Sequence, residues 1–408
     1  MKKALFSLIT AAVLFTAVSC ASNPAGGKEI AGITTTFDRD EALKDTGKVP
    51  MKDMTGIEIT YDMTTGWNLG NTFDAEARGL GAETAWGQPK TTKAMIDGLA
   101  RSGIKSIRIP VTWHSHNLDK EYTIDSDWTK RVKEVVDWAI EDGMYVILNV
   151  HHDNFGRNAA MPYGAGYYPN ELNKEESLKF LVSTWAQIAL AFNNGYDEHL
   201  VFETLNEPRL RGTPQEWSFS SSNPITKEAQ QVINEFNQAI VDTVRASGGN
   251  NAKRLILVPG YACSPASVLS SDFVVPEDSA NKVGVAVHMY TPYPFAMDPK
   301  GPAKYQQRMA QELNVTFKSL EAKFVKKGIP VVVGEYGATN KDNLEDRCLW
   351  FNTFNRQTRK MGIPCFLWDN NSPYKDSKGY EEKYGFYNRR EQKWYFPEIT
   401  ETIIEAVK

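Results

Sequence analysis

Two glutamates stand at the ends of short apolar segments of this chain. Glu207 directly follows residues 200–206 (LVFETLN), and Glu335 lies near the end of residues 330–337 (PVVVGEYG). A charged carboxylate beside an apolar strand is costly to bury unless pairing or function retains it. Two carboxyl groups together can supply a general acid, a general base and a nucleophile. The pair therefore predicts acid–base or nucleophilic chemistry, with a structural salt bridge as the alternative for either glutamate alone.

Further polar and aromatic residues occur at the same position, where an apolar segment ends. They are Arg108, His151-His152-Asp153, Asn206, His288-Met289-Tyr290 and Trp368-Asp369. If the segments are parallel strands, their carboxyl ends meet at one edge, where catalytic groups can gather without interrupting the core. We therefore expect these side chains to share one site.

Eight apolar segments and the amphipathic stretches between them indicate what positions that site. The segments are 66–69, 106–111, 145–151, 200–206, 254–260, 283–290, 330–337 and 364–370, and the helix-like stretches include 93–102, 128–141, 174–191, 228–246, 304–327 and 343–361. Segments that are apolar on both faces suit parallel strands covered by helices. Gly103, Gly143, Gly328 and Gly362 are placed as helix C-caps. The pattern predicts an α/β fold, a (β/α)₈ TIM barrel with its cleft at the C-terminal face.

Composition and charge exclude other classes of protein. The 408 residues are 41% hydrophobic and 24% charged, with a net charge of −4, which is ordinary for a globular chain and not for a disordered or collagen-like one. No block of like charge stands out, so we expect no nucleic-acid partner. The chain also shows no dinucleotide fingerprint and no P-loop, and we predict a monomer without a cofactor.

The N-terminus has the pattern of an export signal. Lys2 and Lys3 precede an uncharged apolar run at residues 4–18, and small residues lead into Cys20. We predict a lipoprotein signal peptide over 1–19, lipidation at Cys20, a flexible tether over 20–58 and the catalytic barrel over 59–408. The protein would then be an exported, membrane-anchored bacterial lipoprotein, periplasmic or at the cell surface. A plain secretory signal is the alternative.

The remaining cysteines show no metal-binding spacing. Cys263, Cys348 and Cys365 form neither a CxxC nor a CxxxH pattern. We expect buried or partly buried free thiols, and one disulfide among them stays open.

Seven motifs in order give the chain a resemblance to a known family. They are GWNLGNTFD (66–74), IRIPVTW (107–113), ILNVHHD (147–153), FETLNEP (202–208), HMY (288–290), VVGEYG (332–337) and FLWD (366–369). Together they resemble glycoside hydrolase family 5, a family of retaining β-glycosidases. The first motif and the doubled histidine resemble its bacterial endo-β-1,4-glucanase and xyloglucanase subfamily.

The resemblance implies a role for each matching residue. Glu207 matches the general acid/base and Glu335 the nucleophile. Asn206 matches the residue that binds the sugar 2-hydroxyl, and Arg108 and Tyr290 match the groups that hold the nucleophile. His151 and His288 match active-site histidines, and Trp368 matches the platform beneath the sugar. The implied partner is a plant cell-wall β-glucan: cellulose, mixed-linkage glucan or xyloglucan.

Other assignments are less specific. His152 either contacts sugar or caps its strand. One residue separates His116 from His114, so the two would share a face of the site. Asn71 would line the cleft, with a turn-forming role as the alternative. Aromatic residues in the long loops, namely Tyr163, Tyr167, Tyr168 and Trp217, are candidates for sugar subsites.

Three alternatives remain open at this point. A β-mannanase of the same family would share every catalytic residue. A metal-dependent hydrolase would use His114-x-His116, but that pair follows the second strand and no lysine is offered for a metal bridge; we predict no metal. A non-catalytic glycan-binding lipoprotein would be expected to have lost a glutamate or its arginine, and all are present.

Overall fold

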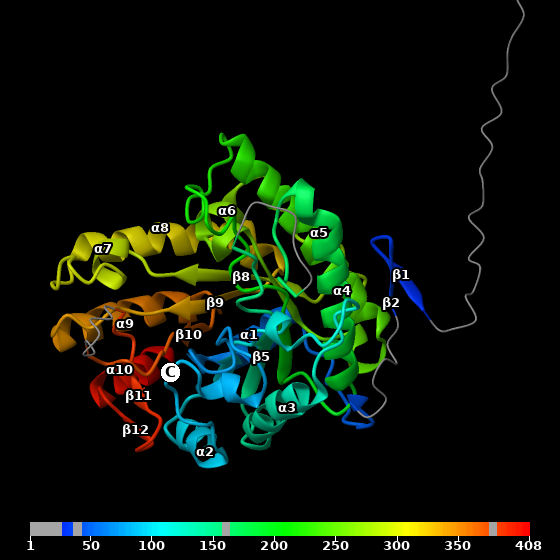
Figure 1. The fold of residues 1–408 in the computed structure, drawn as a ribbon. Helices are drawn as coiled ribbons and strands as arrows, with labels where there is room; N and C mark the ends of the chain where they lie inside the picture. The colour runs from blue at the N-terminus through cyan, green and yellow to red at the C-terminus, as the bar shows by residue number, and fades with distance from the viewer. Residues whose placement is uncertain (1–26, 36–42, 157–163, 375–381) are drawn as a thin grey trace, which may run out of the picture.

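The computed structural model describes residues 27–35, 43–156, 164–374 and 382–408, and these form a closed barrel surrounded by helices (Figure 1). The barrel strands are β3 Thr65–Asn68, β4 Ser106–Ile109, β5 Tyr145–Asn149, β6 Leu200–Glu203, β7 Ile256–Pro259, β8 Val283–Met289, β9 Val331–Tyr336 and β10 Cys365–Leu367. Each pairs with its neighbours in parallel, and β10 closes the ring against β3. The predicted (β/α)₈ barrel and all eight strand segments are confirmed.

Six of the helices around the barrel match the stretches predicted from the sequence. They are α2 Lys93–Arg101, α3 Ser126–Glu141, α4 Lys174–Ala191, α5 Pro224–Ala246, α8 Gln307–Lys323 and α9 Leu344–Lys360. The sequence pattern missed α1 Gly56–Met63, the short α6 Pro265–Leu269, the four-residue α7 Tyr293–Ala296 and the C-terminal α10 Pro397–Val407. A hairpin of β11 Tyr387–Asn388 and β12 Lys393–Trp394 precedes α10.

Glycine ends several of these helices as expected. Gly103, Gly143, Gly328 and Gly362 all have positive φ angles, between 70° and 97°. A side chain is strained in this left-handed region, whereas glycine enters it without cost, so each glycine lets the chain turn from a helix into the next strand. The helix ends are thus encoded locally, and they set where each barrel strand begins.

The barrel interior is apolar towards its N-terminal end and polar towards its C-terminal end. Ile147, Val201 and Leu257 pack inside the barrel with Phe366. Ile59 and Met63 of α1 Gly56–Met63 join the same cluster, so α1 covers this end. The polar strand ends therefore lie above an apolar core that keeps them at the opposite mouth.

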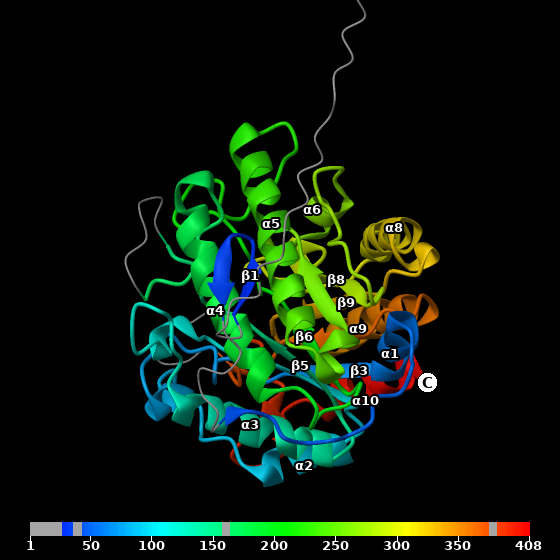
Figure 2. The ribbon, with the colours of Figure 1, turned by 90° about the vertical axis from the view of Figure 1, so that its right-hand side faces the viewer.

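The segment predicted as a flexible tether is more ordered than expected. Strands β1 Lys28–Ile30 and β2 Ile33–Thr35 form an antiparallel hairpin, which lies over α4 and α5 (Figures 1 and 2). Asp45 accepts hydrogen bonds from the backbone N–H groups of Asn193 and Gly195. The featureless composition missed this order because contacts with the helices, not local propensity, create it. Cys20 and the predicted signal peptide lie outside the described residues.

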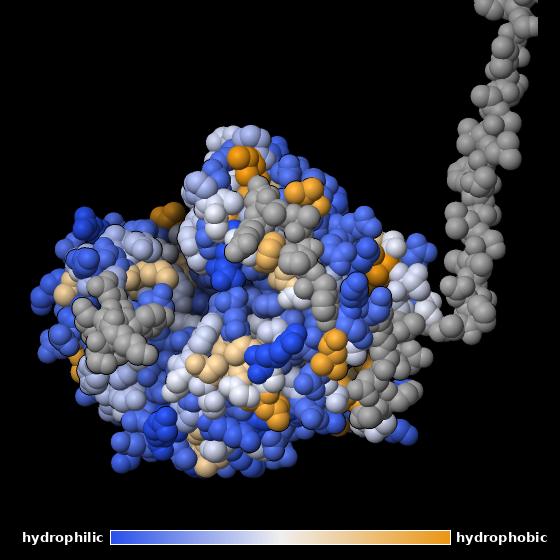
Figure 3. Space-filling view, in the orientation of Figure 1, coloured by the Kyte–Doolittle hydropathy of each residue, from blue (hydrophilic) through white to orange (hydrophobic). Residues whose placement is uncertain are grey.

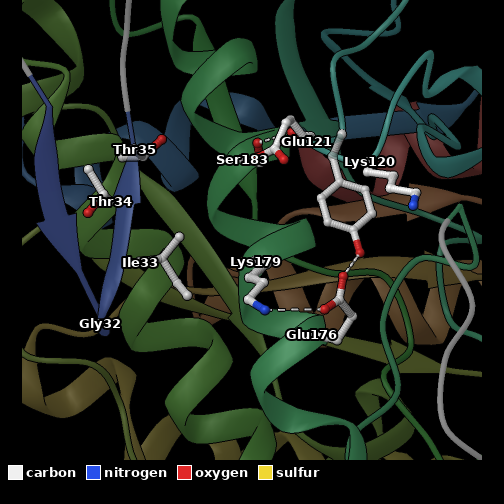
Figure 4. A pocket seen from close by; sticks show the side chains of 10 residues that line it. Gly32, Ile33, Thr34, Thr35, Lys120, Glu121, Glu176, Lys179 and Ser183 are labelled. Atoms are coloured by element: carbon white, nitrogen blue, oxygen red, sulfur yellow. Dashed lines mark hydrogen bonds and ion pairs between the residues drawn. The ribbon is translucent and has the colours of Figure 1, made fainter.

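A small pocket of about 390 Å³ accompanies the hairpin. It is lined by residues 32–35, by residues 120–122 and by Glu176, Lys179 and Ser183 of α4 (Figure 4). The hydroxyl of Tyr122 donates to Glu176. None of its lining residues belongs to the large cleft described below.

Three further observations complete the fold. Cys263 and Cys365 are buried, Cys348 is partly buried, and all three are free thiols, as predicted. None of the helices in the described part of the chain has the length and apolar character needed to cross a membrane. The space-filling view shows a mainly hydrophilic face, hollowed near its middle, on which apolar residues are scattered (Figure 3).

Candidate active site

A cleft of about 1610 Å³ lies at the carboxyl ends of the barrel strands. Its lining combines polar residues at strand ends with aromatic side chains. The residues that face it include Asn71, Trp86, His151, His152, Asn206, Glu207, Arg209, Trp217, His288, Tyr290, Tyr293, Glu335, Trp368 and Tyr384. Nine of the eleven residues predicted for catalysis or support are in this set, and Arg108 and His116 are not.

 These nine residues are the two predicted glutamates and seven of the nine predicted supporting residues, and they line one cleft.

Arg108 lies beneath the cleft, fully buried, and connects its polar residues. Its Nη1 donates to Oε1 of Glu335 (2.8 Å) and to Oδ1 of Asn68 (3.0 Å), and its Nη2 donates to Oδ1 of Asn206 (2.7 Å). Its Nε donates to Glu203 at 2.8 Å. Burial alone lowers the pKa of Arg108, but the carboxylates of Glu203 and Glu335 outweigh it and raise the pKa above its ordinary value. Arg108 is therefore a fixed positive charge that orients its partners.

Glu335 is held by donors on both of its oxygens. Besides Arg108 at Oε1, the hydroxyl of Tyr290 donates to Oε2 at 3.0 Å. Burial and the nearby charge of Glu207 raise the pKa of Glu335 above its ordinary value, and the opposing effect of His288 and Arg108 reduces this shift without cancelling it. Two donors aimed at one carboxylate favour its ionised form and fix its orientation. This is the state that a carboxylate nucleophile requires.

Glu207 has a different environment. Its Oε1 lies 2.8 Å from Nδ1 of His288, and its Oε2 lies 3.6 Å from the guanidinium of Arg209. Burial raises the pKa of Glu207, against the opposing effect of Arg209 and Arg108. A carboxyl group whose pKa is raised keeps its proton to higher pH, which is what a general acid needs.

His288 lies between the two carboxylates. Its Nδ1 is 2.8 Å from Glu207 and 3.6 Å from Glu335, and burial lowers its pKa to about 4 despite the opposing charge of Glu335. One oxygen from each glutamate and one ring nitrogen of His288 all lie within 4.8 Å of one another. Retaining glycosidases hold their carboxyl groups ~5–5.5 Å apart, whereas inverting enzymes need ~6.5–9.5 Å.

Trp368 and His151 provide two parallel ring faces at the cleft. The rings are 6.1 Å apart with only 2° between their planes. A Cβ atom at Gly70 would lie 2.8 Å from Trp368 Cη2, so only glycine leaves room for this indole. Asn149 contacts His151 Nδ1 at 3.1 Å, and burial lowers the pKa of His151 well below its ordinary value. A neutral imidazole and an indole face are thus available to a sugar.

Of the polar residues that follow β3 and β5, some line the cleft and others lie buried behind it. Asn71 lines the cleft, with a positive φ of 56°, so its turn geometry and its cleft position coexist. His152 also lines the cleft, 3.9 Å from Asp74 and with its ring 5.7 Å from that of Trp86. Asp74 itself is fully buried and accepts from the backbone N–H groups of Asn71 and Thr72.

His116 does not lie where we expected it. Its ring is buried and stacks on Trp128 at 3.8 Å, and it does not line the cleft. The two-residue spacing placed it on the same face as His114, but the chain forms a 3₁₀ turn over His114–His116, which directs the two side chains apart. His114 instead bonds to Asp153 at 3.0 Å. Among the described residues neither histidine belongs to a group of metal-ligating side chains, so the His-x-His pair does not form the metal site considered above.

The loop aromatics also differ from one another. Tyr167 and Tyr168 are fully buried, so they are core residues, whereas Trp217 is 62% exposed and lines the cleft. Tyr163 lies outside the described residues. Trp86, Tyr293 and Tyr384 line the cleft as well and were missed, because a single aromatic residue in a loop carries no signal that distinguishes a subsite from a surface contact.

Three polar residues support the cleft from behind, and none of them was predicted for this role. Asn68 donates to backbone carbonyls of β9 and β10 and accepts from Arg108. Glu203 and Asn149 bond to each other at 2.7 Å. Glu203 could have been found, because it is a carboxylate inside an otherwise apolar strand segment, which is costly without a partner.

Comparisons with known proteins agree with this geometry. The family model for cellulase (glycosyl hydrolase family 5) matches residues 70–373. The chain is 44% identical to Endoglucanase 1 of Ruminococcus albus over 85% of this chain and 80% of that protein. It is 41% identical to Endoglucanase A of Clostridium longisporum over 93% of this chain and 71% of that protein.

Solved structures give the same result. A glycoside hydrolase 5 lichenase from Caldicellulosiruptor sp. F32, solved as a mutant with cellotetraose, has a TM-score of 0.81 at 40% identity. The match covers 89% of this chain and 98% of the lichenase chain. A broad-specificity endoglucanase from Ruminococcus champanellensis with bound cellotriose has a TM-score of 0.79 at 41% identity, covering 87% and 100%. The fold, the paired glutamates and these similarities lead to one conclusion: the chain belongs to glycoside hydrolase family 5, the cellulase family.

Proposed function

We propose that this protein is a retaining endo-β-1,4-glucanase that hydrolyses internal bonds of β-glucans by double displacement. The observation that carries the proposal is the short separation of Glu207 and Glu335, whose nearest oxygens lie within 4.8 Å. That spacing leaves no room for the water that an inverting enzyme places between its carboxyl groups.

In the first step Glu335 is the nucleophile and Glu207 the acid. A carboxylate oxygen of Glu335 forms a bond to the anomeric carbon, the bond to the leaving oxygen breaks, and Glu207 gives its proton to that oxygen. In the second step Glu207 removes a proton from water, the water oxygen attacks the anomeric carbon, and Glu335 leaves as a carboxylate. The different hydrogen bonds of the two glutamates support this division.

The supporting residues have physical reasons for their proposed roles. Arg108 uses the acceptor oxygen of Asn206, so the amide N–H group of Asn206 is the part that can donate to the sugar 2-hydroxyl. Trp368 presents an aromatic face to the flat C–H face of a pyranose. Trp217 lies against the guanidinium of Arg209 at 4.0 Å, which orients its ring for stacking on a second sugar.

The β-glucan class rests on the relatives. Proteins with this fold and similar identity are named endoglucanases and a lichenase, and two were solved with cello-oligosaccharides. We therefore propose cellulose, mixed-linkage glucan or xyloglucan over mannan. Initial rates on xyloglucan, barley glucan, carboxymethylcellulose and mannan test this: highest activity on mannan would favour the mannanase alternative, and no hydrolysis of any would favour a binding protein.

Azide tests the two catalytic roles. In Glu207→Ala an aryl glycoside with a good leaving group should still form the glycosyl-enzyme, which azide then attacks to give a β-glycosyl azide. In Glu335→Ala azide must attack from the opposite face and give the α-product. An α-azide from Glu207→Ala would show that the two roles are assigned the wrong way round.

We also propose that the protein is an exported lipoprotein anchored through Cys20. The apolar run, the small residues before the cysteine and the polar residues after it support this proposal. The ordered hairpin begins at Lys28, close in sequence to Cys20, so a membrane-anchored enzyme would have only a short linker.

A further inference from the structure

Glu203 is a carboxylate beneath the cleft. It lies in β6, four positions before Glu207, and is fully buried. Its Oε2 accepts hydrogen bonds from Arg108 Nε at 2.8 Å and from Asn149 Nδ2 at 2.7 Å. Arg108 Nη2 also lies 2.7 Å from the same oxygen. Glu203 does not line the cleft, so any effect on the reaction has to pass through its neighbours.

Arg108 is therefore held between two carboxylates. On one side its Nε and Nη2 face Glu203, and on the other its Nη1 donates to Glu335 at 2.8 Å. Both ion pairs are buried: the side chains of Arg108 and Glu203 are 0% exposed and that of Glu335 is 8% exposed. Charges that are this well shielded from water interact strongly, and breaking one pair leaves a buried charge that is costly.

The charge of Glu335 changes during the proposed reaction, whereas that of Glu203 does not. When Glu335 bonds to the anomeric carbon it becomes an uncharged ester, and Arg108 loses one counter-ion. Glu203 has no bond to the sugar and keeps its charge. The guanidinium is thus paired both before and after the covalent step.

We infer that Glu203 is a positioning residue that serves as the permanent counter-ion of Arg108 and thereby promotes formation of the glycosyl-enzyme. This inference rests on the proposed role of Glu335 as the nucleophile. When Glu203 is present, Arg108 pairs with two carboxylates, so it holds Glu335 in place while its positive charge is divided between Glu335 and Glu203. Without Glu203, Arg108 would pair with Glu335 alone, and this tighter pair would stabilise the enzyme before reaction. Once Glu335 had become an ester, Arg108 would be a buried cation without a counter-ion.

The same charge affects the pH dependence. Removing a negative charge near the cleft favours the ionised forms of Glu335 and Glu207, so the pKa of each should fall. Other charged or titratable groups around the two glutamates include Arg108, Arg209, Glu216, His151, His288, Tyr167, Tyr290, Tyr384 and Cys263. Burial keeps the histidines, the three tyrosines and Cys263 neutral near neutral pH. Both limbs of the bell-shaped profile of kcat/KM should therefore move to lower pH.

The test compares Glu203→Gln with a matched control. Glu83 is also a buried glutamate paired with an arginine, Arg131, at 2.8 Å, but it does not line the cleft or contact Arg108. Glu83→Gln should reproduce any general cost of breaking a buried Glu–Arg pair. Both full-length variants would be compared by thermal unfolding, by the pH profile of kcat/KM, and by the rate of inactivation with a 2-deoxy-2-fluoro-cellobioside, which reports glycosylation alone.

For Glu203→Gln we expect inactivation to slow at least about tenfold, with both pH limbs about one unit lower. Glu83→Gln should keep both limbs and the wild-type inactivation rate, whatever its melting temperature. Glu203→Asp, which keeps the charge, should keep the pH limbs and lose only part of the rate; it also serves as the test if Glu203→Gln does not fold. Wild-type inactivation and pH limbs in a folded Glu203→Gln, or displaced limbs in Glu203→Asp, would overturn the inference.

Failure of this inference differs from failure of the proposed function. If Glu335 is not the nucleophile, Glu335→Ala keeps turnover or the azide products have the opposite anomeric form. If only the role of Glu203 is wrong, those results hold and Glu203→Gln behaves like Glu83→Gln.

Discussion

The hydroxyl of Tyr290 donates to Oε2 of Glu335 at 3.0 Å, while Arg108 occupies Oε1 of the same carboxylate at 2.8 Å. The two donors come from β4 and from the residue after β8, so only barrel closure brings them to one carboxylate. Burial raises the pKa of Tyr290 well above its ordinary value, and its phenol therefore keeps the proton that it donates. This relationship gives the first prediction.

Tyr290→Phe should move the acidic limb of kcat/KM to higher pH. The lost hydrogen bond stabilised the ionised form of Glu335, so its removal raises the pKa of that carboxyl, and activity is then lost at a higher pH as the pH falls. We also expect kcat to fall by roughly 100- to 1000-fold, as for the loss of other charge-stabilising donors. Steady-state rates between pH 4 and pH 9 measure both effects.

Tyr336→Phe is the matched control. Tyr336 follows Glu335 on β9 and is fully buried, whereas Tyr290 is partly buried, and the hydroxyl of Tyr336 donates to Asn355 of α9, outside the barrel. Its loss should reduce stability by about 1 kcal/mol and leave the acidic limb in place. An unchanged limb in Tyr290→Phe, or an equal displacement in both variants, contradicts the prediction.

Gly70→Ala should impair the platform formed by Trp368. The new Cβ would lie 2.7 Å from the carbonyl oxygen of Asp369 and 2.8 Å from the Trp368 ring, so the indole or its backbone has to move. Overpacking of this kind costs about 1–3 kcal/mol of stability. The melting temperature should therefore fall, and KM for cello-oligosaccharides should rise. Gly81→Ala, where nothing lies within 4 Å of the new Cβ, should change neither.

Hydrolysis should not require a divalent metal. The two carboxyl groups can supply the acid, base and nucleophile between them. We expect full activity after dialysis against a chelator, with metal content checked by elemental analysis. Two groups of possible ligands lie at the cleft: Glu207-His288-Glu335, which lines it, and Asp74-His151-His152, in which Asp74 is fully buried and does not line the cleft. If activity were lost in the chelator and recovered when zinc or another divalent ion was added, the result would support the metal-dependent hydrolase instead.

Cys20→Ala should abolish lipidation and release the protein from the membrane without affecting catalysis. The substitution lies far in sequence from every cleft residue, so the purified enzyme should keep wild-type kcat/KM. Cell fractionation and mass spectrometry of the mature N-terminus measure the outcome. Processing that resists globomycin, or a wild-type N-terminus without lipid, would instead support the secretory alternative.

The sequence by itself determined the barrel and most of the residues at its mouth. Strands buried on both faces must be apolar throughout, and glycine is needed where helices end, so these local signals marked all eight strands. Polar residues at strand ends then stood out against apolar neighbours. Glu207, Glu335 and His288 were identified in this way, because a parallel barrel brings every strand end to the same face.

Tertiary structure decided what sequence spacing cannot express. His116 was predicted for the cleft but packs on Trp128, because a 3₁₀ turn separates it from His114. Residues 28–35 were predicted as tether but form a hairpin on α4 and α5, which supply contacts that the local sequence does not show. The pairing of Arg108 with both Glu203 and Glu335 joins three strands far apart in the chain. Hydrogen bonds depend on positions in space to a fraction of an ångström, and only the closed barrel fixes those positions.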